Sequence, residues 1–185
     1  QVLAVIDDLA GLVDGIAGLD TQDGLGGYGL TGTGLADDGQ GLALVQIQAD
    51  AADGVQEKYP QVDRWYIGGH SLGGSMAASY IAKHTDEFKG LILLAAYSTS
   101  DISESGLRVL SIYGSEDTVM NKEKYDECKK NLPAAAIEVK LKGGCHAYFG
   151  MYGEQAGDGT PTITNEEQIK KASDHITKFI KEGEK

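Results

Sequence analysis

The sequence lacks a long hydrophobic stretch, a cysteine framework and an excess of basic residues. No run of about 18 apolar residues occurs in the 185 positions, so no segment is predicted to span a membrane. The two cysteines, Cys128 and Cys145, fit neither a disulfide framework nor a zinc-binding pattern, and we expect both to be plain thiols. The 16 Lys and Arg against 28 Asp and Glu leave a formal net charge of -12, which makes nucleic acid and anionic membranes poor partners.

The first 56 residues lack basic residues altogether. They contain nine Asp and 12 of the 26 Gly but no Lys, Arg or Glu, and only nine residue types build them. We interpret this stretch as engineered, or as an approximate record of the natural sequence. Finding Lys or Arg there by mass spectrometry of tryptic peptides would show that the written sequence of this stretch is wrong. The chain begins with Gln, so we expect the natural start to be missing, and a cytoplasmic and an exported location both fit.

Apolar runs alternate with helical patterns in the rest of the chain, which predicts one α/β domain covering residues 1–185. This alternation is typical of a mostly parallel sheet with helices on both faces. We expect strands at 65–68, 90–97, 107–113 and 136–141, and helices at 75–84, 122–132 and 169–180, the last with a candidate capping box at Thr164 and Glu167. Nearer the start we expect an antiparallel hairpin of 2–6 with 12–17, a poor helix at 28–38, a buried strand at 42–48 and a helix at 49–58.

The most informative stretch is Gly69-His70-Ser71-Leu72-Gly73, which lies between an expected strand and an expected helix. A G-x-S-x-G pattern in that context is typical of a nucleophile elbow, a strained turn that exposes a serine hydroxyl. We expect a Cβ at Gly69 or Gly73 to crowd the turn. The helix behind Ser71 directs free N–H groups at the reacting centre. The alternative interpretation is a glycine-rich turn with Ser71 as an ordinary N-cap.

A serine hydroxyl is a weak nucleophile and needs a base within hydrogen-bond reach. The chain has four histidines. His70 lies inside the elbow, His84 closes the helix after it, and His175 lies in the last helix. His146 follows the strand expected at 136–141, at the sheet edge where active sites of open α/β sheets gather. It is therefore the candidate base, and a solvated loop histidine is the alternative.

The matching acid is expected after another strand. Asp117 follows the strand expected at 107–113 and could hold the Nδ1 side of the imidazole. Glu116 is its rival, and a carboxylate that caps the helix near Asn121 is the alternative to both. The order serine, aspartate, histidine along the chain is the one found in the α/β-hydrolase fold.

Only nine residues, STSDISESG, separate the strands at 90–97 and 107–113, which leaves no room for an inserted lid.

Residues 57–182 resemble small serine hydrolases of the α/β-hydrolase fold, of about the size of the dienelactone hydrolases. The matching segments are EKYP, YIGGHSLGG, GLILLAAY, LSIYGSED and, most specifically, GGCHAYFGMYGEQAGDG. The resemblance implies Ser71 as nucleophile, Asp117 as acid and His146 as base. In the first 56 residues only LADDG and LALVQI look similar.

The resemblance also implies an oxyanion hole, with the backbone N–H of Leu72 as one donor. In this family the second donor follows an early strand in a Pro-Gly-Gly-type loop. The corresponding stretch from Leu19 to Leu25 reads LDTQDGL and does not show that motif. A missing donor costs about 100- to 1000-fold in rate, so this stretch decides how good a catalyst the domain is.

The long loop at 147–163 is rich in glycine and carries three aromatic residues. Long loops in compact domains are usually functional or disordered, and the aromatics favour a function. We expect Phe149 to pack on the core, and at least one of Tyr148 and Tyr152 to line the substrate pocket.

The sequence thus predicts a serine hydrolase that cleaves carboxylic esters of small molecules through an acyl-enzyme. No metal or organic cofactor is implied, and the oligomeric state is not indicated. One alternative is a non-catalytic binding module on the same fold, which the stretch from Leu19 to Leu25 favours. Another is an acyltransferase or thioesterase with the same triad.

Overall fold

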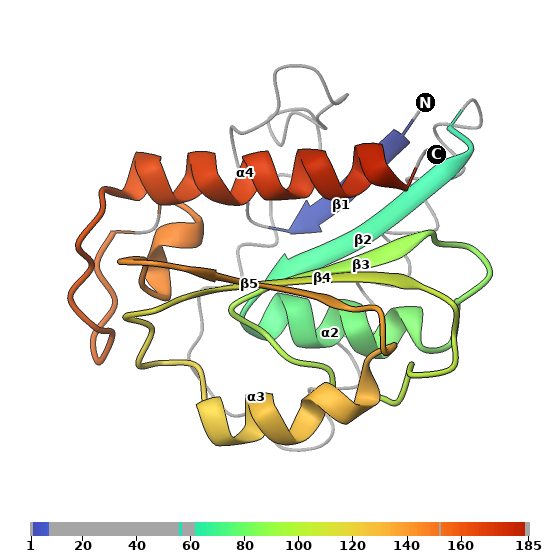
Figure 1. Cartoon of the computed structure of the whole chain (residues 1–185), viewed down its shortest axis with the longest axis horizontal. Helices are drawn as coiled ribbons and strands as arrows, with labels where there is room; N and C mark the ends of the chain where they lie inside the picture. Colours follow the sequence, from blue (N-terminus) through green and yellow to red (C-terminus); the bar gives the residue numbers. More distant parts are fainter. Residues whose placement is uncertain (1, 8–55, 57–61, 152, 184–185) are drawn as a thin grey trace.

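A sheet of five parallel strands forms the centre of the computed structural model, which describes residues 2–7, 56, 62–151 and 153–183. The strands are neighbours in chain order: β1 (Val2–Asp7), β2 (Arg64–His70), β3 (Gly90–Leu94), β4 (Arg108–Gly114) and β5 (Ile137–Leu141) (Figure 1). Because all pairings are parallel, the carboxyl ends of the strands meet at one edge. The loops that follow β2, β4 and β5 therefore leave the sheet on the same side.

Helices cover both faces of this sheet, as predicted. α2 (Leu72–Ile81) and α3 (Lys122–Cys128) lie on one face and α4 (Asn165–Glu182) on the other (Figure 1). Two short 3-10 helices complete the described elements: η1 (Lys129–Asn131) continues α3, and η2 (Ala147–Phe149) follows β5. No helix in the described ranges is long and apolar enough to cross a membrane.

The two faces of β3 belong to two separate parts of the core. All five of its residues are buried. Leu91 and Leu93 pack in the cluster that includes α2, whereas Ile92 and Leu94 pack in the cluster that includes α4. A parallel strand covered on both faces needs apolar side chains at every position, which explains the uninterrupted run GLILL.

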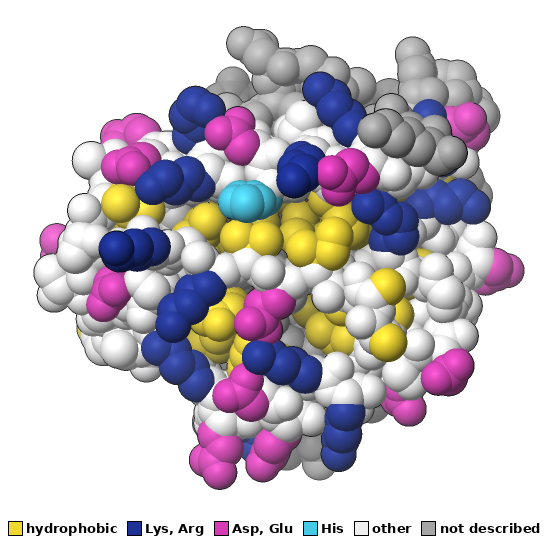
Figure 2. Space-filling view, viewed as in Figure 1, with side chains coloured by type: hydrophobic (Ala, Val, Ile, Leu, Met, Phe, Trp, Pro, Cys, Tyr) yellow, Lys and Arg dark blue, Asp and Glu magenta, His cyan; other side chains and the backbone are white. Residues whose placement is uncertain are grey.

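α4 begins at Asn165, earlier than the predicted helix at 169–180, because Thr164 caps it. The Thr164 hydroxyl accepts a hydrogen bond from the Glu167 N–H at 3.1 Å. The predicted capping box is only half formed, since the Glu167 carboxylate pairs with Lys171 at 2.7 Å. Figure 2 shows charged side chains along the outer side of α4 and hydrophobic side chains gathered between α4 and β5.

Other differences from the prediction concern where elements end and pair. β3 ends at Leu94 rather than at residue 97, because Ala95 turns the backbone into the left-handed region with φ 47°. The helix predicted at 122–132 is divided into α3 and η1. β1 confirms the predicted strand at 2–6, but the partner that the structure describes for it is β2, in parallel.

Several predicted elements lie outside the described residues. These are the hairpin partner at 12–17, the helix at 28–38 and the strand at 42–48. Of the helix predicted at 49–58 the structure describes only Gln56, which is helical.

Candidate active site

Ser71 occupies a strained turn between β2 and α2. Its φ of 54° and ψ of -121° place a non-glycine residue at positive φ, which costs free energy and persists only where the surroundings impose it. The Ser71 N–H donates a hydrogen bond of 2.9 Å to the Leu94 carbonyl, which ties the turn to the end of β3. The side chain is half-buried, and α2 starts at the next residue, Leu72.

The glycines around Ser71 only partly have the expected role. A Cβ on Gly69 would lie 2.5 Å from the carbonyl carbon of Gly73, so this position needs glycine. A Cβ on Gly73 would meet no atom within 4 Å, so the expectation that it would crowd the turn is wrong. On the helix side of Ser71, the position without room for a Cβ is Gly74, where a Cβ would lie 2.5 Å from the Gly69 carbonyl oxygen and 2.6 Å from the Ala96 Cβ.

His146 and Asp117 form a buried pair at the edge of the sheet where the carboxyl ends of the strands meet, which is also the edge at which Ser71 follows β2. The His146 Nδ1 lies 2.9 Å from the Asp117 Oδ2, and the side chains are only 2% and 0% exposed. The other carboxylate oxygen of Asp117 accepts hydrogen bonds from the backbone N–H groups of Val119 at 2.9 Å and Met120 at 2.8 Å. One oxygen therefore caps the turn after β4 while the other faces the imidazole.

Glu116, the rival acid, is engaged elsewhere. Its carboxylate accepts a hydrogen bond of 2.6 Å from the Ser115 hydroxyl, and its backbone N–H donates to the Gly144 carbonyl at 2.8 Å. The geometry thus pairs His146 with Asp117.

Two of the other histidines lie in different surroundings. His84 lies 2.8 Å from a Glu87 carboxylate oxygen and stacks on the Tyr80 ring with centroids 4.1 Å apart. His175 is exposed on α4.

The third, His70, brings His146 next to the elbow. The rings of His70 and His146 lie 4.7 Å apart, and the Phe149 ring lies 5.6 Å from His70. Burial, followed by repulsion from His146, lowers the pKa of His70 to about 4, so this ring stays neutral at physiological pH. This contact brings the ring of the candidate base close to the end of β2, from which the chain turns into Ser71.

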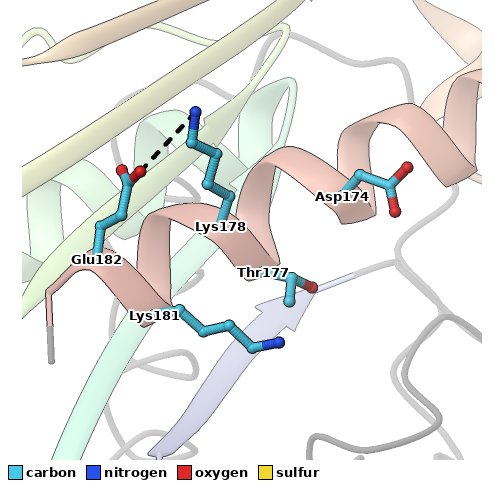
Figure 3. Close-up of a pocket in the computed structure, with 5 residues that line it drawn as sticks. All are labelled: Asp174, Thr177, Lys178, Lys181 and Glu182. Atoms are coloured by element: carbon cyan, nitrogen blue, oxygen red, sulfur yellow. Dashed lines mark ion pairs between the residues drawn. The ribbon is translucent and has the colours of Figure 1, made fainter.

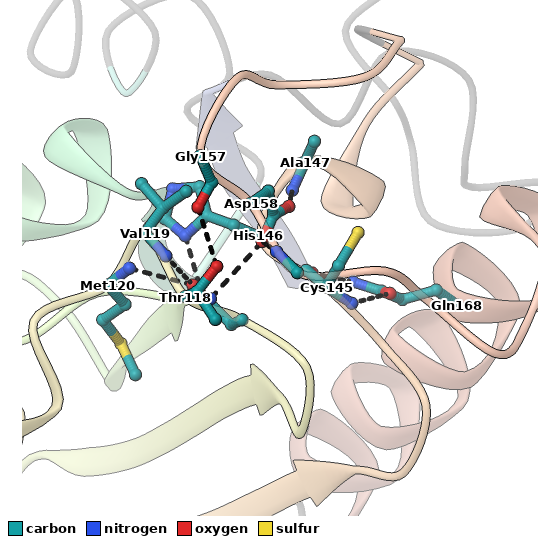
Figure 4. Close-up of polar contacts among 11 residues, drawn as sticks. Thr118, Val119, Met120, Cys145, His146, Ala147, Gly157, Asp158 and Gln168 are labelled. Carbon is teal, nitrogen blue, oxygen red and sulfur yellow. Dashed lines mark hydrogen bonds and ion pairs between the residues drawn. The ribbon is translucent and has the colours of Figure 1, made fainter.

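Gln168 on α4 holds the residue directly before His146. Its amide oxygen accepts a hydrogen bond of 2.9 Å from the Cys145 N–H, and its amide nitrogen donates one of 2.8 Å to the Cys145 carbonyl (Figure 4). Gln168 is 0% exposed, so both bonds are shielded from water. A Cβ on Gly144 would lie 2.6 Å from the Gln168 amide oxygen, which explains the glycine there.

Asp158 holds the residue directly after His146. Its Oδ2 accepts a hydrogen bond of 2.9 Å from the Ala147 N–H, and its Oδ1 accepts one of 2.8 Å from the Gly159 N–H. Burial raises the pKa of Asp158, but hydrogen bonds from the Ala147 and His146 backbone outweigh it, so the pKa falls below its usual value. Nearby, the Thr118 hydroxyl donates to the Gly157 carbonyl at 2.7 Å and joins this loop to the Asp117 loop (Figure 4).

Both cysteines are free thiols, as expected. Cys145 is buried, and burial followed by its hydrogen bond to Asp158 raises the pKa of the thiol to about 11. It therefore stays protonated and is a poor nucleophile, although it lies next to His146.

Sequence reasoning missed the contributions of His70, Asp158 and Gln168. Gln168 left a visible signal, because it lies one helical turn before Ala172 and two before Ile176 on the buried stripe of α4. A polar side chain on such a stripe needs a buried partner. The contacts of His70 and Asp158 join residues far apart in the chain and leave no such pattern.

The predicted pocket residues are only partly described. Phe149 is fully buried in the core cluster beneath α4, as expected for a packing residue. Tyr148 is half-buried in η2, whereas Tyr152 lies outside the described residues. The predicted second oxyanion donor, between Leu19 and Leu25, also lies outside them. The first donor, the N–H of Leu72, is at the start of α2, where backbone N–H groups have no acceptor within the helix.

A separate surface hollow of about 340 Å³ lies along the C-terminal half of α4 (Figure 3). It is lined by Asp174, Thr177, Lys178, Lys181 and Glu182, and a 3.8 Å ion pair joins Lys178 to Glu182. None of these residues belongs to the group around Ser71, so the hollow is not the candidate active site.

Several solved structures resemble this chain at low identity. A protein of unknown function from Agrobacterium tumefaciens, described as an α/β hydrolase, has a TM-score of 0.60 at 18% identity, over 82% of this chain and 67% of its own. A thermophilic esterase from Thermogutta terrifontis has a TM-score of 0.56 at 13% identity, over 75% of this chain and 72% of its own. A predicted CIB-like hydrolase from Thermoplasma acidophilum has a TM-score of 0.51 at 18% identity, over 71% of this chain. The match spans 59% of that protein's length.

Comparison with curated proteins finds no match. The profile of the alpha/beta hydrolase family matches residues 31–170, which is more than half of the chain. The parallel sheet, the turn at Ser71 and this match agree with one another. The chain belongs to the alpha/beta hydrolase family.

Proposed function

We propose that this chain is a serine hydrolase of carboxylic esters, with Ser71 as nucleophile, His146 as general base and Asp117 as its orienting acid. The observation that carries the proposal is the buried 2.9 Å contact between His146 Nδ1 and Asp117 Oδ2, beside the strained turn that presents Ser71. Family membership supports a hydrolase, and the esterase among the similar structures is consistent with ester substrates.

We assign the protons of the imidazole from its contact with Asp117. The Nδ1–H donates to the carboxylate, so the Nε2 lone pair is left to accept a proton. The buried carboxylate then stabilises the imidazolium that forms.

The reaction has two steps. As Ser71 Oγ attacks the ester carbonyl, its proton passes to His146, which returns it to the alcohol oxygen when the carbon–oxygen bond breaks. The acyl group is then bound to Ser71 as an ester. A water molecule gives a proton to His146, attacks the acyl carbon and releases the carboxylic acid, and Ser71 recovers its proton.

The Leu72 N–H is proposed as one donor to the oxyanion of the tetrahedral intermediates. It lies at the N-terminus of α2, whose partial positive charge also favours an anion. The second donor is proposed between Leu19 and Leu25. Tyr148 and Tyr152 are proposed as walls of the substrate pocket, a role that fits the half-buried state of Tyr148.

Labelling with a fluorophosphonate tests the proposal directly. We expect one adduct on Ser71, detected by mass spectrometry, and hydrolysis of short nitrophenyl esters. The Ser71→Ala variant should lose both while its circular dichroism spectrum stays unchanged. A wild-type protein that folds but neither reacts with the probe nor cleaves esters would contradict the proposal and favour a binding module. Faster acyl transfer to an added alcohol or thiol than to water would favour an acyltransferase.

A further inference from the structure

The ring of His70 contacts two other rings, one of the candidate base and one of the hydrophobic core. On one side it lies 4.7 Å from the ring of His146, and it also lies 5.6 Å from the ring of Phe149. Phe149 is 0% exposed and packs in the cluster with Ala172 and Ile176 of α4. Neither contact is required for His70 to belong to the strand, because β2 is already paired on both sides with β1 and β3.

We propose that His70 is a positioning residue for His146, and that its ring fixes the orientation of the base and keeps water from one side of it. This inference rests on the proposed function. The elbow determines where Ser71 points, and the residue just before it determines where the base lies. The turn thus positions both partners of the proton transfer.

The short distance between the two rings explains why the His70 ring must stay uncharged. His146 becomes an imidazolium during the reaction, and a positive charge on a ring 4.7 Å away would oppose that step. The titratable groups that act on His70 are His146, Asp117 and Asp158, and burial has the largest effect. Burial and repulsion from His146 together lower the pKa of His70, and they outweigh a hydrogen bond with the His146 backbone and the attraction of the two carboxylates, all of which raise it.

Three variants separate the effect of the His70 ring from the effects of its charge and its hydrogen-bonding groups. His70→Phe keeps a ring but cannot ionise or make hydrogen bonds. His70→Gln keeps hydrogen-bonding groups but has no ring. His70→Ala removes both. Phe88→Ala is the matched control, because Phe88 is a buried aromatic that packs on Tyr80 and precedes β3, at the opposite edge of the sheet from Ser71.

The measurement is the second-order rate constant of fluorophosphonate labelling of Ser71 as a function of pH, with a melting temperature for each variant. We expect His70→Phe to remain within about threefold of wild type, since a ring of similar size fills the same space. His70→Gln and His70→Ala should lose about 10- to 100-fold, because a displaced base no longer reaches the hydroxyl. Water admitted beside the base should also move the midpoint of the acidic limb of this pH profile to higher pH.

The readouts distinguish positioning from stability alone. Phe88→Ala should lower the melting temperature and leave the midpoint of the acidic limb where it is in wild type. If His70→Ala does not fold, the comparison of His70→Gln with His70→Phe still decides the matter. Wild-type behaviour of His70→Gln, or loss in His70→Phe equal to that in His70→Gln, would overturn the inference. A wild-type protein without labelling would instead overturn the proposed function, and with it this inference.

Discussion

Asp117 has a neighbour of the same charge, so a pair of isosteric substitutions can identify the acid. Asp117→Asn keeps the shape of the side chain but can hold the imidazole in the wrong tautomer, and we expect kcat to fall on the order of 10⁴-fold. Glu116→Gln should stay near wild type, because the Glu116 carboxylate bonds to Ser115 rather than to His146. Both are measured with a nitrophenyl ester. The reverse result would show that the acid is Glu116.

The two glycines after Leu72 allow an equally direct comparison. Gly74→Ala should destabilise the fold by about 1 to 3 kcal/mol or more and slow labelling, because its Cβ meets backbone that cannot move away. Gly73→Ala adds the same methyl group one residue earlier into open space, and should stabilise α2 by about 0.5 to 1 kcal/mol. Urea denaturation measures both. Similar losses in the two variants would contradict the geometry of the turn.

His70 should also make stability depend on pH. Its pKa of about 4 in the folded protein lies below the ordinary value of 6.5, so between these values only the unfolded chain binds the proton. The free energy of unfolding should therefore fall as the pH drops from 6.5 to 4, by about 3 kcal/mol from this group. The difference in unfolding free energy between wild type and His70→Gln, measured at pH 7 and pH 4.5, should shrink by about 2 kcal/mol. A constant difference would mean that His70 is not buried as described.

At the scale of elements, α4 both covers the sheet and positions the loop of the candidate base. Gln168→Leu removes two buried hydrogen bonds to Cys145 and leaves its backbone groups unsatisfied, so we expect a loss of about 2 to 4 kcal/mol in stability. The labelling rate should fall as well, since Cys145 precedes His146. Lys170→Leu on the exposed side of the same helix is the control and should change neither quantity appreciably. Unchanged labelling in a folded Gln168→Leu protein would show that the loop keeps its shape without this contact.

The elements differ in how far the sequence predicts them. β3 and β4 are predicted well, because strands buried on both faces need uninterrupted apolar runs. The end of β3 is not, because the turn at Ala95 depends on its contact with Ile112 of the neighbouring strand. The parallel pairing of β1 with β2 is also a tertiary property, since a short apolar run is compatible with either direction.

The candidate site, like the elements, is predicted in part from the sequence and depends in part on tertiary contacts. The residue types and order of Ser71, Asp117 and His146 are visible in the sequence, as is the place of each after a strand, here β2, β4 and β5. The choice between Asp117 and Glu116, and between Gly73 and Gly74, depends on a displacement of one residue that only the packed turn decides.

At the scale of the whole molecule, the short connection between β3 and β4 leaves the catalytic edge without an inserted lid there. It runs from residue 95 to residue 107 and contains no helix. We therefore expect small or exposed esters to be the better substrates, with acetate and butyrate nitrophenyl esters showing a higher kcat/KM than long-chain esters. A rising preference with acyl length, measured below the micelle concentration, would contradict this prediction.

The bond between Gln168 and Cys145 also concerns the order in which the protein is made. Ser71, Asp117 and His146 leave the ribosome before the helix that holds the histidine loop in place. A nascent chain that ends before residue 168 has all three side chains but not this contact. We expect full reactivity of Ser71 to arise only as the last helix docks, so that fluorophosphonate labelling of released chains would report the completion of the fold.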